Sequence, residues 1–155
     1  MKVALAQMEV IPNKPQTNLE TMLRHVHDAK AQGVDLIAFP ELSVSGYLLG
    51  DKWLEQRYVE NLMSFNETLK EASEGIAIAY GNVFVDNQVG HPNKDGRVRK
   101  YNAVYVYQNK KLVSRKNKIS VLPNGVQPKT LLPNYRFFDD ERYFFSLQDV
   151  AKDYG

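Results

Sequence analysis

Apolar and polar positions along the first half of the chain alternate between strand-like runs and a helical stretch. Residues 3–8 form a short apolar run typical of a buried strand, and residues 34–39 form another. Between them, residues 19–29 repeat apolar side chains at helical spacing. We expect this helix to have Asn18 as its N-cap and to end at Gly33. Strand, helix and strand in this order predict a βαβ unit with parallel strands.

A second helix and a third strand follow. Apolar residues recur at helical intervals from about residue 54 to residue 72, and Gly75 ends that stretch. Residues 76–85 then read as a strand, and the polar, Gly- and Pro-containing residues 87–100 read as a loop.

The remainder of the chain has a weaker pattern. Residues 102–107 and 112–115 predict a hairpin joined by the four residues 108–111. From residue 119 onward the periodicity fails, and three prolines favour an extended segment that suits the rim of a site. The polar residues 148–155 predict no further element.

The predicted class is α/β, but its elements do not complete such a fold. Parallel sheets usually carry helices on both faces, and the pattern predicts only about two long helices. We therefore expect residues 1–155 to be the front portion of a larger domain. Half of such a fold would leave an apolar sheet face exposed.

Composition restricts the chemistry more than the partners. The 155 residues carry a formal net charge of +2 and no cysteine. The chain's own residues therefore form no disulfide, no thiolate metal site and no thiol nucleophile. No apolar run is long enough to span a membrane, and the first strand leaves no room for a signal peptide, so we expect a cytoplasmic protein.

Two charged residues are candidates for chemistry. Glu41 directly follows a predicted buried strand, and the carboxyl ends of strands are where α/β enzymes collect functional groups. Lys129 lies between prolines. No spacing rule separates Lys129 from the nearby Lys118. By position alone a solvated surface charge is the favoured interpretation of both Glu41 and Lys129. His25 and His27 lie two residues apart on a helix and face different sides, so we predict no metal site.

A basic segment allows a different interpretation. Residues 94–118 hold nine Lys or Arg residues and one acid, Asp95, with Tyr101, Tyr105 and Tyr107 interleaved. This pattern would fit a non-catalytic module that binds nucleic acid. Alternating tyrosines are also ordinary strand residues that pack on a sheet. Because the overall charge is nearly balanced, we favour the second interpretation and expect no nucleic-acid partner.

Several short blocks together resemble one family. They are the apolar run 3–8, residues 39–47 (FPELSVSGY), Gly81-Asn82, Tyr101-Asn102-Ala103, and residues 129–144 (KTLLPNYRFFDDERYF). The chain resembles the nitrilase, or carbon–nitrogen hydrolase, superfamily over almost its whole length. More narrowly, the last block is similar to the amino-terminal glutaminase domain of glutamine-dependent NAD synthetases.

The resemblance implies a fold and a set of site residues. It implies the amino-terminal portion of a nitrilase-type α-β-β-α sandwich and a Glu-Lys-Cys triad. Glu41 then takes the place of the general base, and Lys129 keeps the family's spacing of six residues to Tyr135. Tyr47 and Tyr135 fall where the family shapes its glutamine pocket. Asp140 stands where this branch usually has Glu, and its side chain is one methylene shorter.

The resemblance also implies an activity and partners. The family cysteine lies on a strand beyond the tyrosine block, so we expect a chain truncated before its nucleophile and inactive alone. The parent protein would hydrolyse L-glutamine and pass ammonia to a synthetase domain, absent here, that makes NAD from deamido-NAD with ATP and magnesium. It would be a homo-oligomer, and this chain itself would hold no cofactor. A stand-alone nitrilase-branch amidase is the alternative within the family.

Overall fold

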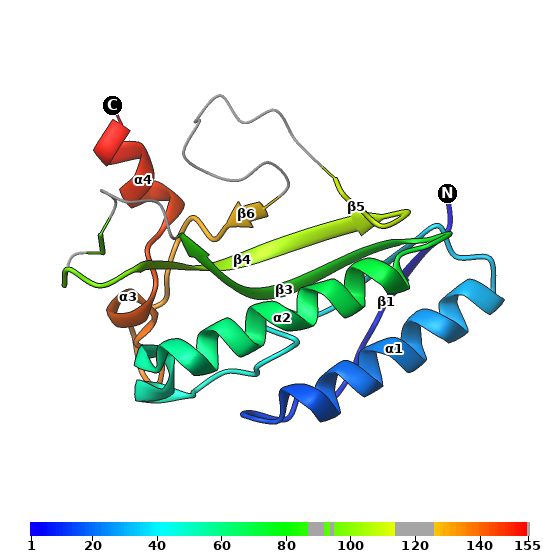
Figure 1. Cartoon of the computed structure of the whole chain (residues 1–155), viewed down its shortest axis with the longest axis horizontal. Helices are drawn as coiled ribbons and strands as arrows, with labels where there is room; N and C mark the ends of the chain where they lie inside the picture. The colour runs from blue at the N-terminus through cyan, green and yellow to red at the C-terminus, as the bar shows by residue number, and fades with distance from the viewer. Residues whose placement is uncertain (87–91, 94, 114–125, 155) are drawn as a thin grey trace.

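One mixed sheet organises the residues that the computed structural model describes, which are 1–86, 92–93, 95–113 and 126–154. Its strands are β1 (Val3–Leu5), β2 (Leu36–Ala38), β3 (Ala77–Asp86), β4 (Arg99–Gln108), β5 (Lys111–Leu112) and β6 (Val126–Pro128). β1, β2 and β3 are parallel neighbours, and β4 runs antiparallel to β3 (Figure 1). β5 and β6 pair antiparallel with β4.

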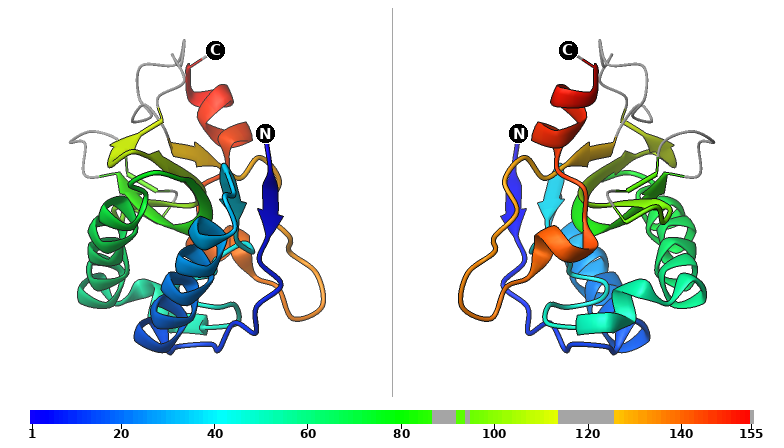
Figure 2. Two further views of the ribbon diagram at one scale, coloured as in Figure 1. Left: turned by 90° about the vertical axis from the view of Figure 1, so that its right-hand side faces the viewer. Right: turned by 90° about the vertical axis from the view of Figure 1, so that its left-hand side faces the viewer.

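Two long helices, α1 (Pro15–Ala31) and α2 (Gln56–Ala72), cover one face of this sheet (Figure 2). A 3₁₀ turn, η1 (Gly50–Leu54), precedes α2, and α3 (Asp140–Tyr143) and α4 (Leu147–Tyr154) follow β6. The predicted βαβ opening, its parallel strands and both long helices are confirmed. The class is α/β.

The predicted start of the first helix is wrong. α1 begins with Pro15, three residues before Asn18. Proline suits the first helical position because its missing N–H needs no partner there. Asn18 is instead buried, and its side-chain amide donates to the carbonyl oxygens of Ile11 at 2.9 Å and Val44 at 3.0 Å. Gly33 follows the helix in the left-handed conformation, as predicted.

Aromatic residues of β3 and β4 form the centre of the core against α2. The ring of Tyr80 stacks on those of Tyr105 and Tyr107, with centroids 5.5 and 6.3 Å apart. The Tyr80 hydroxyl donates to Asn66 of α2 at 2.8 Å, so the buried polar atom is paired. The tyrosines of the basic segment therefore pack inward, as the favoured interpretation predicted.

Several basic side chains around these tyrosines form ion pairs or hydrogen bonds within the fold. Arg99 is buried and pairs with Asp153 of α4 at 2.9 Å, and Lys100 is buried and donates to the carbonyl of Trp53. Lys110 pairs with glutamates of α2 and the turn after it. Within its described residues the basic segment is thus largely part of the fold; residues 87–91, 94 and 114–118 lie outside the described part.

The predicted hairpin differs in its bounds. β4 begins at Arg99, inside the predicted loop, and the connection to β5 has two residues rather than four. Asn109 and Lys110 form that turn, both with positive φ, which matches the twist of paired strands. The predicted strand residues 114 and 115 lie outside the described part.

The predicted lack of structure near the C-terminus is wrong at two places. β6 pairs with the middle of β4, Pro128 standing opposite Ala103. The polar residues after 147 form α4, whose Val150 is fully buried. Ser146 starts this helix with a capping box: its hydroxyl accepts from the Asp149 N–H at 2.9 Å, and Asp149 accepts from Ser146.

The second face of the sheet is apolar and largely open. Residues paired across strands point to the same side, so one side collects Leu5, Ala38, Ala79 and Val104 together with their neighbours. Leu5 is 74% exposed and Val104 is 44% exposed. The expected uncovered face is confirmed. Among the described residues, none of the helices combines the length and apolar character needed to cross a bilayer.

Truncating a side chain should destabilise the protein much more on the buried face of the sheet than on the open face. Ile78 is fully buried against the helices, whereas Val104 lies on the open face. Ile78→Ala should lower the free energy of unfolding by about 2–5 kcal/mol because it leaves a cavity. Val104→Ala should cost less than about 1 kcal/mol. Urea denaturation of both variants measures the difference, and equal losses would contradict this assignment of the faces.

Candidate active site

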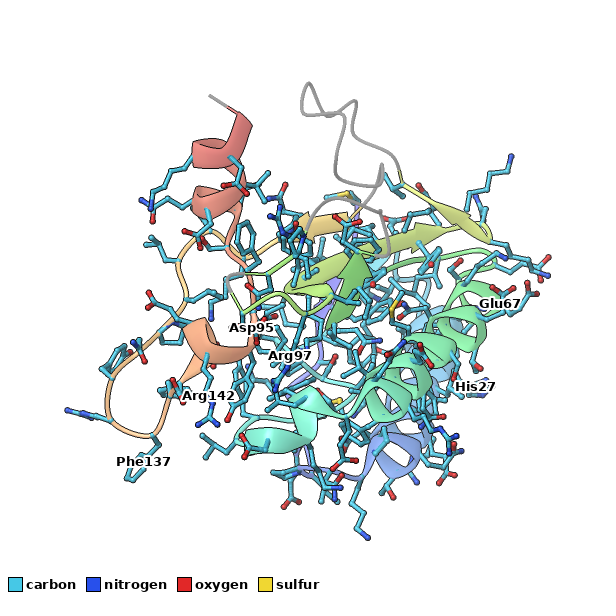
Figure 3. All side chains as sticks on the ribbon, turned by 60° about the vertical axis from the view of Figure 1, so that its left-hand side comes forward. His27, Glu67, Asp95, Arg97, Phe137 and Arg142 are labelled. Atoms are coloured by element: carbon cyan, nitrogen blue, oxygen red, sulfur yellow. The ribbon has the colours of Figure 1, made fainter. Side chains whose placement is uncertain are left out.

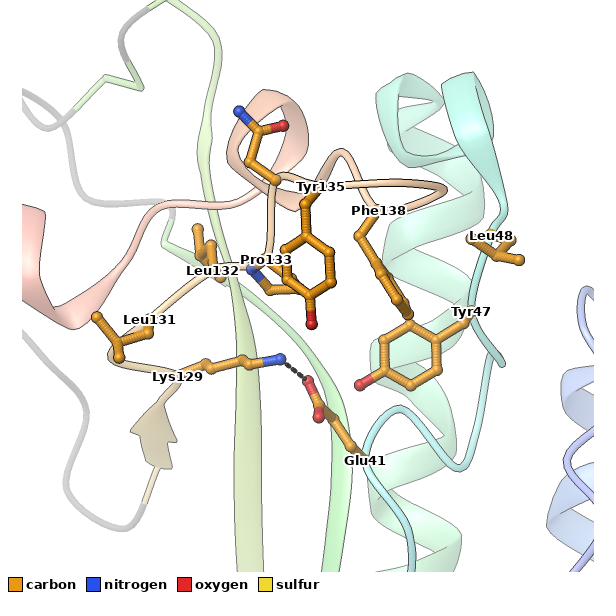
Figure 4. A pocket seen from close by; sticks show the side chains of 10 residues that line it. Glu41, Tyr47, Leu48, Lys129, Leu131, Leu132, Pro133, Tyr135 and Phe138 are labelled. Atoms are coloured by element: carbon orange, nitrogen blue, oxygen red, sulfur yellow. Dashed lines mark hydrogen bonds and ion pairs between the residues drawn. The ribbon is translucent and has the colours of Figure 1, made fainter.

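Glu41 and Lys129 meet at the open face of the sheet, although 88 residues separate them in the chain. The Lys129 ammonium Nζ donates to Glu41 Oε1 at 2.6 Å (Figure 4). The Asn102 side-chain amide donates to the same oxygen at 2.5 Å. The meeting of the two predicted side chains is therefore observed. Asn102 was not predicted as a site residue, although its motif was noted.

The loop that carries Glu41 is buried and anchored on several sides. Each of residues 42–45 is at most 1% exposed. Val44 accepts the hydrogen bond from Asn18 of α1, and the Ser45 carbonyl accepts from the Asn13 N–H at 2.9 Å. Leu42 adopts a φ of +46°, a left-handed conformation that costs a leucine roughly 1–2 kcal/mol. Packing thus holds Glu41 on a strained turn.

Gly81 of β3 allows this loop to lie directly on the sheet. A Cβ at Gly81 would stand 2.3 Å from the Leu42 nitrogen and 2.9 Å from the Glu41 Cα. No side chain fits there, so glycine sets how closely Glu41 approaches the strands. Sequence reasoning placed Gly81 in a family motif without this role.

Lys129 is held through its backbone. Its N–H donates to the Asn102 carbonyl at 2.8 Å, extending the pairing of β6 with β4. Its carbonyl accepts from the Leu147 N–H at 3.0 Å, at the start of α4. The short strand and the missed C-terminal helix therefore fix where the lysine side chain begins.

The electrostatics favour an ionised carboxylate. Burial raises the pKa of Glu41, but hydrogen bonding with Lys129, Tyr47 and Asn102 and the lysine charge outweigh it, so the net pKa lies below its ordinary value. Burial and the adjacent Glu41 carboxylate raise the pKa of Tyr47 far above its ordinary range. Tyr47 therefore stays a neutral hydroxyl.

Aromatic and apolar side chains surround the pair. A pocket of about 620 Å³ is lined by Glu41, Tyr47, Leu48, Lys129, Leu131, Leu132, Pro133, Asn134, Tyr135 and Phe138. Figure 4 shows the hydroxyl ends of Tyr47 and Tyr135 directed toward the charged pair. Phe138 contacts both rings, with centroids 6.0 and 5.9 Å away, and was not predicted. Phe137, by contrast, is 82% exposed and projects from this loop (Figure 3).

Asp140, the first residue of α3, is not among the residues that line this pocket. It is buried, and its Oδ2 has no hydrogen-bond partner among the described residues. Burial raises the pKa of Asp140; Lys129 opposes that shift, whereas Glu41 and Asp139 add to it, and the net pKa is raised. A second hollow, of about 470 Å³, extends from Glu41 and Lys129 over Ala79 and Val104 on the open face.

The described residues contain no candidate metal-binding cluster. Over residues 1–86, 92–93, 95–113 and 126–154, no set of three or more His, Cys, Asp or Glu side chains could hold a metal ion.

Comparison with known proteins identifies the family. The carbon-nitrogen hydrolase family model matches residues 2–149. The chain belongs to the carbon–nitrogen hydrolase family. The glutamine-dependent NAD(+) synthetase of Acinetobacter baylyi is 32% identical over 143 residues, which are 92% of this chain and 23% of the relative. The chain thus spans less than a quarter of the length of this relative.

Solved structures agree with the fold. The glutamine-dependent NAD+ synthetase of Acinetobacter baumannii aligns with a TM-score of 0.66 and 32% identity over 93% of this chain and 23% of that chain. An amidase from Nesterenkonia sp. aligns with a TM-score of 0.69 over 94% of this chain and 48% of that chain. At 20% identity, the amidase supports the fold alone. The resemblance seen in the sequence blocks is thus confirmed for both the carbon–nitrogen hydrolase family and its fold.

The first site prediction concerns the ionisation of Glu41. Lys129→Met removes the cation and leaves the burial, so the Glu41 carboxyl should titrate at higher pH, measured by ¹³C NMR. Because the folded pKa is depressed, the pair stabilises the fold above the unfolded pKa and loses that contribution as pH falls through the folded pKa. Lys110→Met, at a pair remote from Glu41, is the control. A Glu41 titration unchanged by Lys129→Met would refute the coupling.

The second site prediction concerns the fit of the loop on β3. Gly81→Ala should lower the free energy of unfolding by about 1–3 kcal/mol through overpacking and displace the Glu41 carboxyl resonance. Gly75→Ala is the matched control, because Gly75 has positive φ but no atom within 4 Å of its Cβ position. It should destabilise without moving the Glu41 resonance. Identical spectra for both variants would argue against the close approach.

Proposed function

We propose that this chain supplies the general base and the cationic partner of a site that hydrolyses the side-chain amide of L-glutamine. The observation that carries the proposal is the Glu41–Lys129 ion pair, with its 2.6 Å contact, at one end of an aromatic-lined pocket. Membership of the carbon–nitrogen hydrolase family supports it, and so does the similarity to the Acinetobacter enzymes, which are glutamine-dependent NAD synthetases.

The chemistry follows from the charges at the site. Glu41 is ionised and takes the proton of a cysteine thiol, and the thiolate attacks the amide carbon of glutamine. The Lys129 ammonium stabilises the negative charge that develops on the carbonyl oxygen. Glu41 then returns the proton to the departing nitrogen, and ammonia leaves a glutamyl thioester. Water loses a proton to Glu41 and attacks the thioester, which releases glutamate and the cysteine thiolate. Glu41 then gives its proton to that thiolate, and the thiol and the ionised carboxylate are restored.

The pocket suits a substrate of this size. Its volume of about 620 Å³ lies within the range of small-molecule sites. Tyr47 offers a neutral hydroxyl beside the carboxylate, and Tyr135 forms the exposed rim. Asp140 is buried within reach of the charges of Glu41 and Lys129, and its side chain extends less far than that of a glutamate. These three are the proposed glutamine-binding residues.

The nucleophile and the ammonia acceptor are proposed to lie outside these residues. The chain has no cysteine and matches 23% of its synthetase relative. A synthetase domain using ATP and magnesium would take the ammonia and form NAD from deamido-NAD, in a cytoplasmic homo-oligomer. The alternative is a stand-alone amidase of the same family that acts on free small amides.

Ammonia release tests the proposal. The chain alone should release none from glutamine, whereas the chain extended through the family cysteine should do so. In that extended protein Glu41→Gln should lower kcat by about 10²–10⁴-fold, and Glu20→Gln on the exposed side of α1 should not. Hydrolysis of a free aliphatic amide in preference to glutamine would favour the amidase. Activity of the isolated chain would overturn the proposal.

A further inference from the structure

Asn102 connects the two halves of the charged pair. It is 2% exposed and lies on β4, opposite Val83 of β3. Its side-chain amide donates to Glu41 Oε1 at 2.5 Å, and its backbone carbonyl accepts the Lys129 N–H at 2.8 Å. One strand residue therefore contacts both the carboxylate and the backbone of the lysine.

Two of the three hydrogen-bonding partners of Glu41 meet at a single oxygen, and the third partner is Tyr47. Lys129 Nζ and Asn102 Nδ2 both donate to Oε1, at 2.6 and 2.5 Å. A carboxylate oxygen has two lone pairs, so these two hydrogen bonds fill the acceptor capacity of Oε1. A proton accepted by Glu41 then binds at Oε2, the oxygen to which neither Lys129 nor Asn102 donates.

We propose that Asn102 is a positioning residue that holds Glu41 and Lys129 at one point of β4 and confines proton exchange to Oε2 of Glu41. The inference rests on the proposed function, in which Glu41 accepts the nucleophile's proton and later gives it to the leaving nitrogen. A fixed Oε1 orients Oε2 for both transfers, and the same proton leaves by the position at which it arrived.

The chemistry of asparagine fits this task. Its amide is a neutral donor, so it fixes the carboxylate without adding a second full charge to the pair. Aspartate would present an acceptor and a like charge to Glu41, and leucine would leave a lone pair of Oε1 without its donor. Both substitutions keep nearly the same volume at this buried position.

Asn82 provides a matched control on the neighbouring strand. It is also fully buried, but its amide donates toward α2, to the Leu62 carbonyl at 2.8 Å and to Asn66 at 2.9 Å. Substituting Asn82 therefore disturbs a buried asparagine of the same sheet without touching Glu41. It separates a general loss of packing from a loss of positioning.

The test is a pH titration of the Glu41 carboxyl by ¹³C NMR in the chain as it stands. Asn102→Leu and Asn102→Asp should each shift the Glu41 midpoint to higher pH and move the Lys129 Nζ resonance. Asn82→Asp should leave both unchanged. If one Asn102 variant does not fold, the other gives the result. If Glu41 in a folded Asn102 variant titrates as it does in the unsubstituted chain, the inference is overturned.

Kinetics of the extended protein distinguish this inference from the proposed function. Asn102→Leu should lower kcat by about 100-fold with little change in KM and move the acidic limb of the pH profile to higher pH. Suppose that the unsubstituted extended protein hydrolyses glutamine and that Asn102→Leu leaves its pH profile unshifted. That result overturns the inference and leaves the proposed function standing. If the unsubstituted extended protein has no glutaminase activity but the Asn102 variants show the NMR shifts, the proposed function is refuted. The coupling of Asn102 to the Glu41–Lys129 pair then still holds.

Discussion

The Glu41–Lys129 contact is the constraint on which the rest of the site depends. It joins a loop near the start of the chain to a segment 88 residues later. Both side chains are only partly exposed, so each charge loses part of its hydration and needs the other as compensation. The pair can form only if both segments are held in place, and the surrounding structure holds each of them. The loop is fixed by α1 and Gly81, and the lysine backbone is fixed by β4 and α4.

These supports are rigid because they use the sheet itself. The loop residues after Glu41 are buried, and the left-handed Leu42 is maintained by its packing. On the other side, β6 contributes only a few ladder contacts, but they fall beside Asn102. A small number of backbone hydrogen bonds thus determine the position of a long and otherwise flexible lysine side chain.

Local elements were predictable from sequence where a regular pattern of buried residues marks them. Both long helices bury one periodic face, so their periods identify them, whereas β3 is marked by a largely apolar run that is buried on both sides over much of its length. The start of α1 was missed because a proline at its first position outweighed the capping preference of Asn18, which is used in a tertiary contact. α4 was missed although Ser146 and Asp149 form a capping box, because its eight residues are too few for a helical period to stand out in the sequence. The pairing of Glu41 with Lys129 came from the family resemblance, since no local pattern encodes a contact between distant segments. The roles of Gly81 and Asn102 depend on distances across strands and became evident only in the folded chain.

The open apolar face has an electrostatic consequence. The hollow that begins at Glu41 and Lys129 runs along this face, so bulk solvent reaches the charged pair from that side. Any layer that comes to rest on Ala79 and Val104 would expel this water and lower the local dielectric constant around the carboxylate and the ammonium. Their field would then act on a reacting group with less screening. Covering the sheet and strengthening the field at the pair are, for this geometry, the same event.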